Sequence, residues 1–170
     1  MERTTHQLKT ISPEAITRAI AKAERYRLLN QSWATESICL DILEVDPTNQ
    51  PVLVMLILAI TDQFGRESGE LVRRARATLE RLTDPYQRAY YAGIISERLA
   101  HAQLTSGAMH AEAMAFTTLR SAMESFEKAE QLRQPGNDDS ILRWNTCQRT
   151  LAGMRRQEVA DEVYEPSFGE

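Results

Sequence analysis

Apolar residues recur along this chain at intervals of three and four positions, the spacing of one face of an α-helix. The first such stripe opens after Ser12 and Pro13, a pairing typical of a helix N-cap with proline at the first helical position. Its members are Ile16, Ala19, Ala23, Tyr26 and Leu29. Asn30-Gln31 interrupts the pattern, so we expect the first helix to end there.

A second amphipathic segment extends from Ser32, its expected cap, to Val45. Its apolar positions, which we expect to face a core, are Trp33, Ile38, Cys39, Ile42, Leu43 and Val45. Asp46-Pro47 ends the segment, because a residue before proline disfavours the α conformation. The first two segments therefore predict a hairpin of antiparallel helices.

The segment 50–64 is apolar on every side between Val52 and Ile60. A buried β-strand is the alternative, since Val and Ile also favour strands, but the length and the flanking residues favour a helix. A helix that is apolar all round must be covered on most faces. We therefore expect this helix in the middle of a stack.

Four more helices are predicted over residues 68–82, 85–104, 109–133 and 138–154. The breaks between them contain Asp84-Pro85, Thr105-Ser106-Gly107 and Gln134-Pro135-Gly136-Asn137. Such short connections predict antiparallel neighbours, and the whole pattern predicts an all-α protein with about seven helices. Residues 12–156 form the expected helical domain, 1–11 a flexible N-terminal segment and 157–170 an acidic, disordered tail.

Composition agrees with a helical core, because hydrophobic residues make up 42% of the 170 residues and aromatic residues only 6%. The net charge of −4 comes largely from the acidic end of the chain, so the body carries no basic surface typical of nucleic-acid binding. Cys39 and Cys147 lie inside expected helices, which favours two buried thiols over a disulfide. No apolar run has the length of a signal peptide or a membrane span, so we expect a cytoplasmic protein without a membrane partner.

Several residues carry a resemblance to a known repeat family. Ala23 and Tyr26 stand three apart on the first helix, and Leu43-Glu44-Val45-Asp46-Pro47 closes the second. Ala113, Phe116 and the segment 122–129 repeat part of the pattern. The chain thereby resembles the tetratricopeptide repeat (TPR) family. The resemblance implies a right-handed stack of helical hairpins whose concave face binds peptide segments.

The chain also departs from that family. Thr35, Cys39 and Ile42 stand where alanine, an aromatic residue and alanine are usual. The family's best-known site, a clamp for a carboxylate, needs lysine and asparagine at positions that here hold Ile20, Glu24 and Leu58. The resemblance therefore implies no carboxylate clamp.

Arginines concentrate between residues 66 and 88 and alternate with acidic residues. One interpretation is a solvated face with ion pairs inside the helix. The other is a groove for an acidic peptide, or a docking site for the acidic tail of the chain, with Arg74 as its representative.

The segment from Asn137 to Cys147 is the most distinctive short stretch of the sequence. Its polar residues around Trp144 could form a recognition patch. The alternative is a capped terminal helix in which Trp144 packs against the end of the stack and Arg143 pairs with Asp139, one turn before it.

No constellation of catalytic residues is evident, and His101, His110 and Glu112 lack the fixed spacing of a helical metal site. We therefore expect no catalytic, cofactor-binding or metal-binding residues. The sequence predicts a non-enzymatic TPR-like adaptor or scaffold that binds a protein or peptide through a helical groove, with an acidic partner as one of the open alternatives. The predicted partner-binding residues are Tyr26, Arg74, Tyr90, Arg143 and Trp144.

Two alternatives stay open. A small-molecule pocket could be lined by Met55, Met109, Met114, Met123 and Tyr91. A self-associating structural protein, a homo-oligomer, could use the apolar third helix as its seam.

Overall fold

The computed structural model describes residues 7–65 and 68–163, with side chains up to residue 155. A 3₁₀ turn, η1 (Pro13–Ala15), precedes seven α-helices in this part of the chain. These are α1 (Ile16–Leu28), α2 (Ser32–Val45), α3 (Gln50–Thr61), α4 (Gly69–Leu79), α5 (Pro85–Thr105), α6 (Ala111–Leu132) and α7 (Asp139–Val163). The described residues contain no strand, so the predicted all-α class is confirmed.

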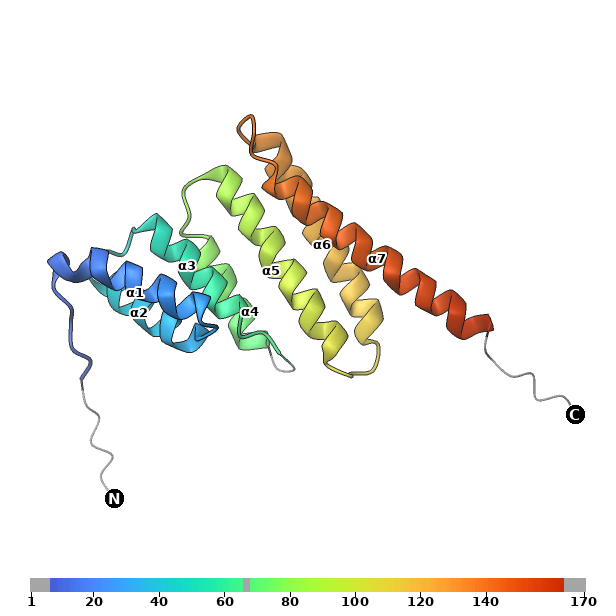
Figure 1. Ribbon diagram of the computed structural model, residues 1–170, viewed down its shortest axis with the longest axis horizontal. Coiled ribbons are helices and arrows are strands. Elements are labelled where there is room, and N and C mark those ends of the chain that lie inside the picture. The colour runs from blue at the N-terminus through green and yellow to red at the C-terminus, as the bar shows by residue number, and fades with distance from the viewer. Residues whose placement is uncertain (1–6, 66–67, 164–170) are drawn as a thin grey trace, which may run out of the picture.

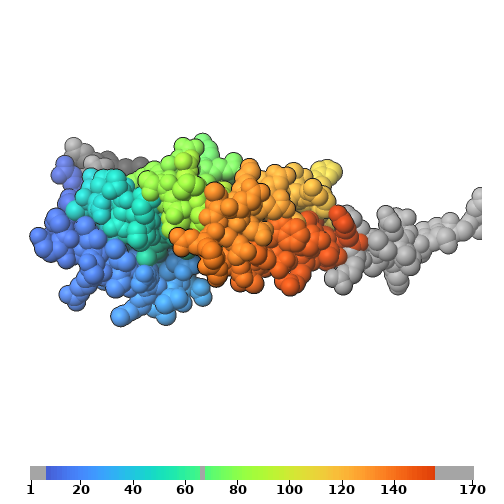
Figure 2. Space-filling view, turned by 90° about the horizontal axis from the view of Figure 1, so that it is seen from above, coloured from blue at the N-terminus to red at the C-terminus, as the bar shows by residue number. Residues whose placement is uncertain are grey.

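Each helix packs against the next one in the sequence, from α1 to α7. Figure 1 shows the helices side by side in chain order, and in Figure 2 the colours follow one another along the long axis of the molecule. The predicted stack of antiparallel helices is therefore confirmed. A second set of contacts joins α1 to α3 and α3 to α5, so the odd-numbered helices form one row of the stack.

Helix α3 lies in the middle of the N-terminal half, and its residues are buried on most sides. The buried set is Val52, Leu53, Met55, Leu56, Ile57, Ala59, Ile60 and Thr61. Asn49 caps its start, since the side-chain oxygen accepts a hydrogen bond of 3.2 Å from the backbone N–H of Val52. The apolar segment is thus a covered helix, as its length and flanks predict.

Buried side chains gather in two clusters, which we call the first and the second core. The first core lies among α1 to α4 and includes Cys39, Ile42 and Ile57. The second core lies among α5 to α7 and includes Leu119, Phe126 and Cys147. Three residues join the cores, because Ile95 of α5 belongs to the first, Leu58 of α3 packs against the second, and Tyr91 contacts both.

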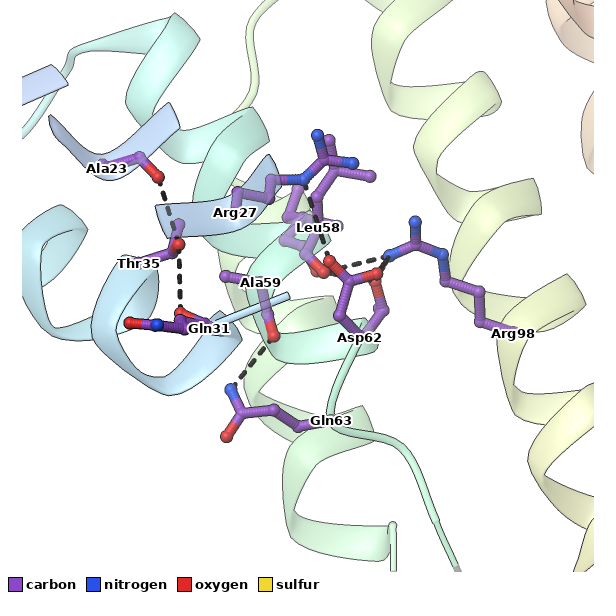
Figure 3. A network of polar contacts seen from close by, with 11 residues as sticks. Ala23, Arg27, Gln31, Thr35, Leu58, Ala59, Asp62, Gln63 and Arg98 are labelled. Carbon is purple, nitrogen blue, oxygen red and sulfur yellow. Dashed lines mark hydrogen bonds and ion pairs between the residues drawn. The ribbon is translucent and has the colours of Figure 1, made fainter. Parts of the chain in front are cut away.

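The α1–α2 hairpin closes around a small residue. Ala23 is fully buried, and its carbonyl oxygen accepts a hydrogen bond of 3.1 Å from the Oγ1 of Thr35 on α2 (Figure 3). The same hydroxyl lies 3.3 Å from the carbonyl of Gln31. Because alanine leaves room for the neighbouring backbone, the two helices approach closely, and the threonine finds an acceptor although it is buried.

The N-terminal end of α2 differs from expectation. Gln31 precedes the helix and Ser32 is its first residue, and no side chain caps this end. Trp33 is 71% exposed and Leu29 is 60% exposed, although both belong to the apolar stripes. Their inward placement was a wrong prediction, because both lie at the short α1–α2 connection, where the packed surface of the hairpin has already ended.

Both ends of the chain extend past the described core. Helix α7 continues to Val163, beyond residue 157, where the sequence places the start of the acidic tail. The remaining tail residues and residues 1–6 lie outside the described residues. In the described part of the chain, no helix combines the length and the apolar character needed to cross a membrane.

Candidate functional site

A groove crosses the odd-numbered helices, and its first part is a cavity of about 510 Å³ that we call the α3 cavity. Residues of α1 on one side and α5 on the other enclose the exposed side of α3. The main contributors are Glu24, Arg27 and Leu28 from α1, Val54, Met55 and Leu58 from α3, and Gln87 and Tyr91 from α5. Three helices that do not follow one another in the sequence thus share one surface.

The pattern of burial on α3 explains the apolar floor of this cavity. Most of α3 is covered, but Val54 and Leu58 are only half-buried. They stand four residues apart, which places them on one face of the helix. Leu28 is 79% exposed at the rim. The α3 cavity therefore presents aliphatic side chains to any molecule that enters it.

A second cavity, of about 600 Å³, continues the groove between the start of α5 and the α6–α7 turn. We call it the tyrosine cavity, because Tyr86, Tyr90 and Tyr91 line it. Gln87 and Tyr91 belong to the walls of both cavities, so the two are neighbours along α5. We use the term inner groove for the α3 cavity and the tyrosine cavity together.

The tyrosines are fixed by contacts with one another and with the second core. Tyr86 and Tyr90 stack, with ring centroids 5.8 Å apart and an angle of 14° between the rings. Tyr90 meets the edge of Tyr91 at 5.2 Å and contacts Phe126 at 5.8 Å. This geometry follows from the spacing of Tyr86 and Tyr90 by one helical turn, and it keeps the rings in place without a ligand.

Charged side chains form a network beside the α3 cavity (Figure 3). The Nη1 of Arg98 lies 2.6 Å from the Oδ1 of Asp62 and donates to the carbonyl of Leu58 at 3.0 Å. The Nε of Arg27 lies 3.7 Å from the Oδ2 of Asp62. Arg98 thereby caps the carbonyl end of α3, where a cation is favoured, and connects α3 with α5.

The side chain of Arg143 lies closer to α5 than the sequence indicates. Its Nη1 is 3.4 Å from the Oε2 of Glu97, which is only 3% exposed. The predicted pairing of Arg143 with Asp139 is therefore wrong. Arg143 pairs with Glu97 of α5 instead of Asp139. A buried carboxylate without a cationic partner costs more free energy than an exposed one, because water still solvates the exposed aspartate.

The other predicted partner-binding residues lie apart from one another. Tyr90 lines the tyrosine cavity, whereas Trp144 is outside its lining and donates from its Nε1 to Glu127 of α6 at 2.9 Å. Tyr26 lines a separate cavity of about 400 Å³ and has the ammonium group of Lys22 5.9 Å from its ring centroid. The structure therefore brings only Tyr90 to the inner groove.

Three of the arginines described between residues 68 and 88 are engaged within the protein. Arg74 pairs with Glu36 of α2, and Arg73 pairs with Glu70 on its own helix. Arg81 donates to the carbonyl of Pro47 at 2.7 Å. The contacts of Arg74 and Arg81 hold α4 and the turn after it to the preceding hairpin, which weakens the basis for an acidic peptide at this surface.

The methionines of the alternative small-molecule pocket do not gather at one site. Met109 and Met114 are 83% and 51% exposed, Met55 belongs to the first core and Met123 packs against the second. In the described residues, no group of three or more His, Cys, Asp or Glu side chains is placed to hold a metal ion.

No protein-family model, curated protein or solved structure matches this chain. The function must therefore be argued from the side chains of the inner groove. Among the described residues that line its two cavities, none is His, Cys, Ser or Thr. The groove thus offers apolar, aromatic, amide and charged groups for binding.

Most residues of the groove were not predicted as site residues. Val54 and Leu58 look like any other members of the apolar stretch, and only packing distinguishes them. Gln87 carries no signal of its own. Tyr86 could have been found, because its spacing from Tyr90 predicts stacked rings on one helix face.

Proposed function

We propose that this chain is a non-enzymatic, TPR-like adaptor that binds a peptide segment of a partner protein in the inner groove. The single observation that carries this proposal is the α3 cavity, an apolar surface made jointly by α1, α3 and α5. A groove shared by three parallel elements suits a linear segment, because a segment lying across them contacts each helix in turn.

The size of the groove supports this function. Each cavity lies within the range of about 300–1,000 Å³ that is usual for ligand sites. An aliphatic side chain that buries ~100 Å² of apolar surface in the α3 cavity contributes ~2.5 kcal/mol, at ~25 cal/mol per Å². Two or three such contacts contribute ~5–7.5 kcal/mol, and a micromolar complex needs ~8.2 kcal/mol net of the cost of association, so polar contacts along the groove must supply the remainder.

The charge network beside the groove contributes rigidity. Arg98 and Arg27 hold Asp62 from two helices, so the walls on α1 and α5 are fixed relative to α3. A preformed groove loses less conformational entropy when it binds, which favours recognition of a flexible segment. The resemblance of residues 15–47 to TPR hairpins supports the same function by analogy.

A selection from a random peptide library displayed on phage tests this function. The full chain should enrich a family of related peptides, and synthetic versions should bind with a Kd measurable by fluorescence anisotropy. In the Leu28→Glu variant we expect the Kd to rise about tenfold or more, since a charge replaces an exposed apolar wall of the groove.

Leu142→Glu is the matched control. Leu142 is 62% exposed on α7 and does not line the described cavities of the groove. This variant should bind the selected peptides as the original chain does. Equal loss in both variants, or a selection without enrichment, would rule out the inner groove as a peptide site.

A further inference from the structure

The tyrosine cavity combines aromatic and acidic side chains. Tyr86, Tyr90 and Tyr91 line it together with the carboxylates Asp84 and Asp139. Among the described residues that form its walls, none is lysine or arginine. This composition distinguishes it from the α3 cavity, whose charges balance.

The two carboxylates keep the cavity negative even though two helices begin beside it. Asp84 precedes α5 and caps it, accepting a hydrogen bond of 3.0 Å from the backbone N–H of Gln87, and Asp139 is the first residue of α7. Each helix N-terminus carries about half a positive charge. Two carboxylates and two N-termini therefore leave about one net negative charge at the cavity.

The arginines near this region hold carboxylates that lie outside the cavity walls. Arg133 pairs with Asp138 and also donates to the carbonyl of Asn137 at 3.1 Å. Arg143 pairs with Glu97 of α5 and also donates a side-chain hydrogen bond to the hydroxyl oxygen of Tyr90, but it does not line the cavity itself. No cation from the described lining therefore neutralises Asp84 and Asp139 inside the cavity.

Two of the tyrosines, Tyr86 and Tyr91, are held in the neutral form. Burial raises the pKa of Tyr86, and the charge of Asp139 raises it further. Burial likewise raises the pKa of Tyr91, again with a contribution from Asp139. The carboxylate thus lies near both rings, and the quadrupole of a neutral aromatic ring attracts a cation.

We propose that the tyrosine cavity binds an organic cation, a guanidinium or alkylammonium group, carried as an arginine or lysine side chain by the peptide in the inner groove. The inference rests on the proposed function for the source of the cation. The chemistry of the cavity stands without it: Tyr86, Tyr90 and Tyr91 supply ring surfaces, and Asp84 and Asp139 supply the opposite charge.

The shared wall between the cavities specifies the peptide further. Gln87 and Tyr91 line both, so a segment that enters one cavity continues into the other. The preferred peptide therefore carries a basic residue close in sequence to an aliphatic one. A basic partner replaces the acidic partner that the arginine-rich stretch suggests, because those arginines already hold Glu36 and Glu70.

Binding of a cation to the tyrosine cavity is tested first with small molecules, in the absence of any peptide. Butylguanidinium and butylurea have nearly the same shape and differ in charge. Each is titrated into the ¹⁵N-labelled full chain, and backbone amide shifts are followed by NMR. Butylguanidinium should shift the amides of Tyr86, Gln87 and Asn137 in a saturable manner, and butylurea should bind at least about fivefold more weakly.

Two variants locate the site. Asp139→Asn keeps the shape of the side chain and removes its charge, and we expect the Kd for butylguanidinium to rise about threefold to tenfold. Glu130→Gln is the control, since Glu130 is exposed on α6 and lies outside the described cavity lining. It should leave the Kd unchanged. Circular dichroism confirms that both variants remain folded.

Each of the two experiments has a result that would contradict the cation site. Equal binding of butylurea and butylguanidinium would show that charge is not recognised. An unchanged Kd in Asp139→Asn, or shifts confined to amides away from the tyrosine cavity, would place the cation elsewhere.

The experiment with selected peptides tests whether the peptide supplies the cation. Peptides selected by the full chain should contain arginine or lysine, and replacing it by citrulline or acetyl-lysine should raise the Kd about fivefold or more. Selected peptides without a basic residue, combined with probe binding, would overturn the peptide as the source. Probe binding without any selected peptide would reject the proposed function alone, and selected peptides without probe binding would reject the cation site alone.

Discussion

At Glu97 the chain places a carboxylate in the interface between α5 and α7. The residue is 3% exposed, and Arg143, its cationic partner, is 43% exposed at the side chain. Burial raises the pKa of Glu97, and the charges of Arg143, His101 and Arg98 offset only part of that shift. The neutral form of this carboxyl group is therefore favoured by folding relative to the unfolded chain.

The free energy of unfolding should depend on pH in a way that reveals the contribution of Glu97. Because the pKa of Glu97 is raised in the folded state, its contribution is complete below the ordinary value of 4.5 and is lost as the pH rises through the raised pKa. Glu97→Gln fixes a neutral side chain. The free energy of unfolding of the original chain minus that of the variant should therefore fall as the pH rises.

Urea denaturation of both proteins at a series of pH values from about 4 to about 8 measures this difference. Subtraction removes the other titrating groups, which the two proteins share. A difference that grows with pH would mean that the ion pair with Arg143 outweighs burial.

Some of these residue contacts follow from the sequence and others do not. Cys39 and Cys147 were predicted as buried thiols, and both are free and buried. The partner of Arg143 could not be predicted, because Glu97 stands 46 positions earlier in the chain. Spacing within one helix shows neighbours one turn away, whereas contacts between helices depend on how the stack is assembled.

Helices α5 and α6 pack closely at Gly93. A methyl group at this position would lie 2.6 Å from the Cδ1 of Phe126, whose side chain is fully buried. Glycine is therefore required here for close approach, although it is a poor helix former. The sequence shows a glycine inside a helical pattern, but the aromatic ring that it accommodates comes from another helix.

Gly93→Ala should destabilise the protein. Overpacking costs about 1–3 kcal/mol and the gain in helix propensity returns about 1 kcal/mol, so we expect a net loss of up to about 2 kcal/mol. Gly153→Ala on α7 is the matched control, because nothing lies within 4 Å of the added methyl group. That variant should gain up to about 1 kcal/mol. Thermal and urea unfolding compare the two, and stabilisation by both would show that Phe126 moves aside freely.

The helices themselves were largely predictable from the apolar pattern. The stretch from Val52 to Ile60 is a covered helix, as expected, because a helix that is apolar on every side must be covered by its neighbours. Trp33 shows where the pattern misleads, since an apolar residue at a hairpin connection has no helix to pack against. Of the residues that line the inner groove, only Tyr90 was among the predicted partner-binding residues, because the aliphatic ones differ from core residues only in what remains uncovered.

At the scale of the whole molecule, each core contains one cysteine. Burial raises the pKa of Cys39 to about 12, with a contribution from Glu36, and burial raises the pKa of Cys147 to about 12, with a contribution from Glu97. Both thiols are fully buried. Each one therefore reports whether its own core has opened.

Arg98 should couple the opening of the two cores. Its side chain, on α5, holds Asp62 and the end of α3. In the original chain, pulsed labelling with a thiol reagent at increasing urea should modify both cysteines over one common range. In Arg98→Ala the labelling curves of Cys39 and Cys147 should separate. The junction between the two cores then loses the ion pair with Asp62 and the hydrogen bond to the carbonyl of Leu58.

Mass spectrometry of the labelled peptides assigns each curve to its cysteine. Arg149→Ala is the control, since Arg149 is exposed on α7 and is not part of the junction. Coincident curves in all three proteins would show that Leu58, Tyr91 and Ile95 alone couple the cores.

The succession of contacts from each helix to the next also bears on how fast the chain reaches its native state. Partners that are close in sequence need only short loops to close, so little entropy is lost before the contact is made. Chains dominated by such local contacts fold in microseconds to milliseconds. Any hairpin of the stack can start the process, and newly made protein can begin to fold while its C-terminal helices are still being synthesised.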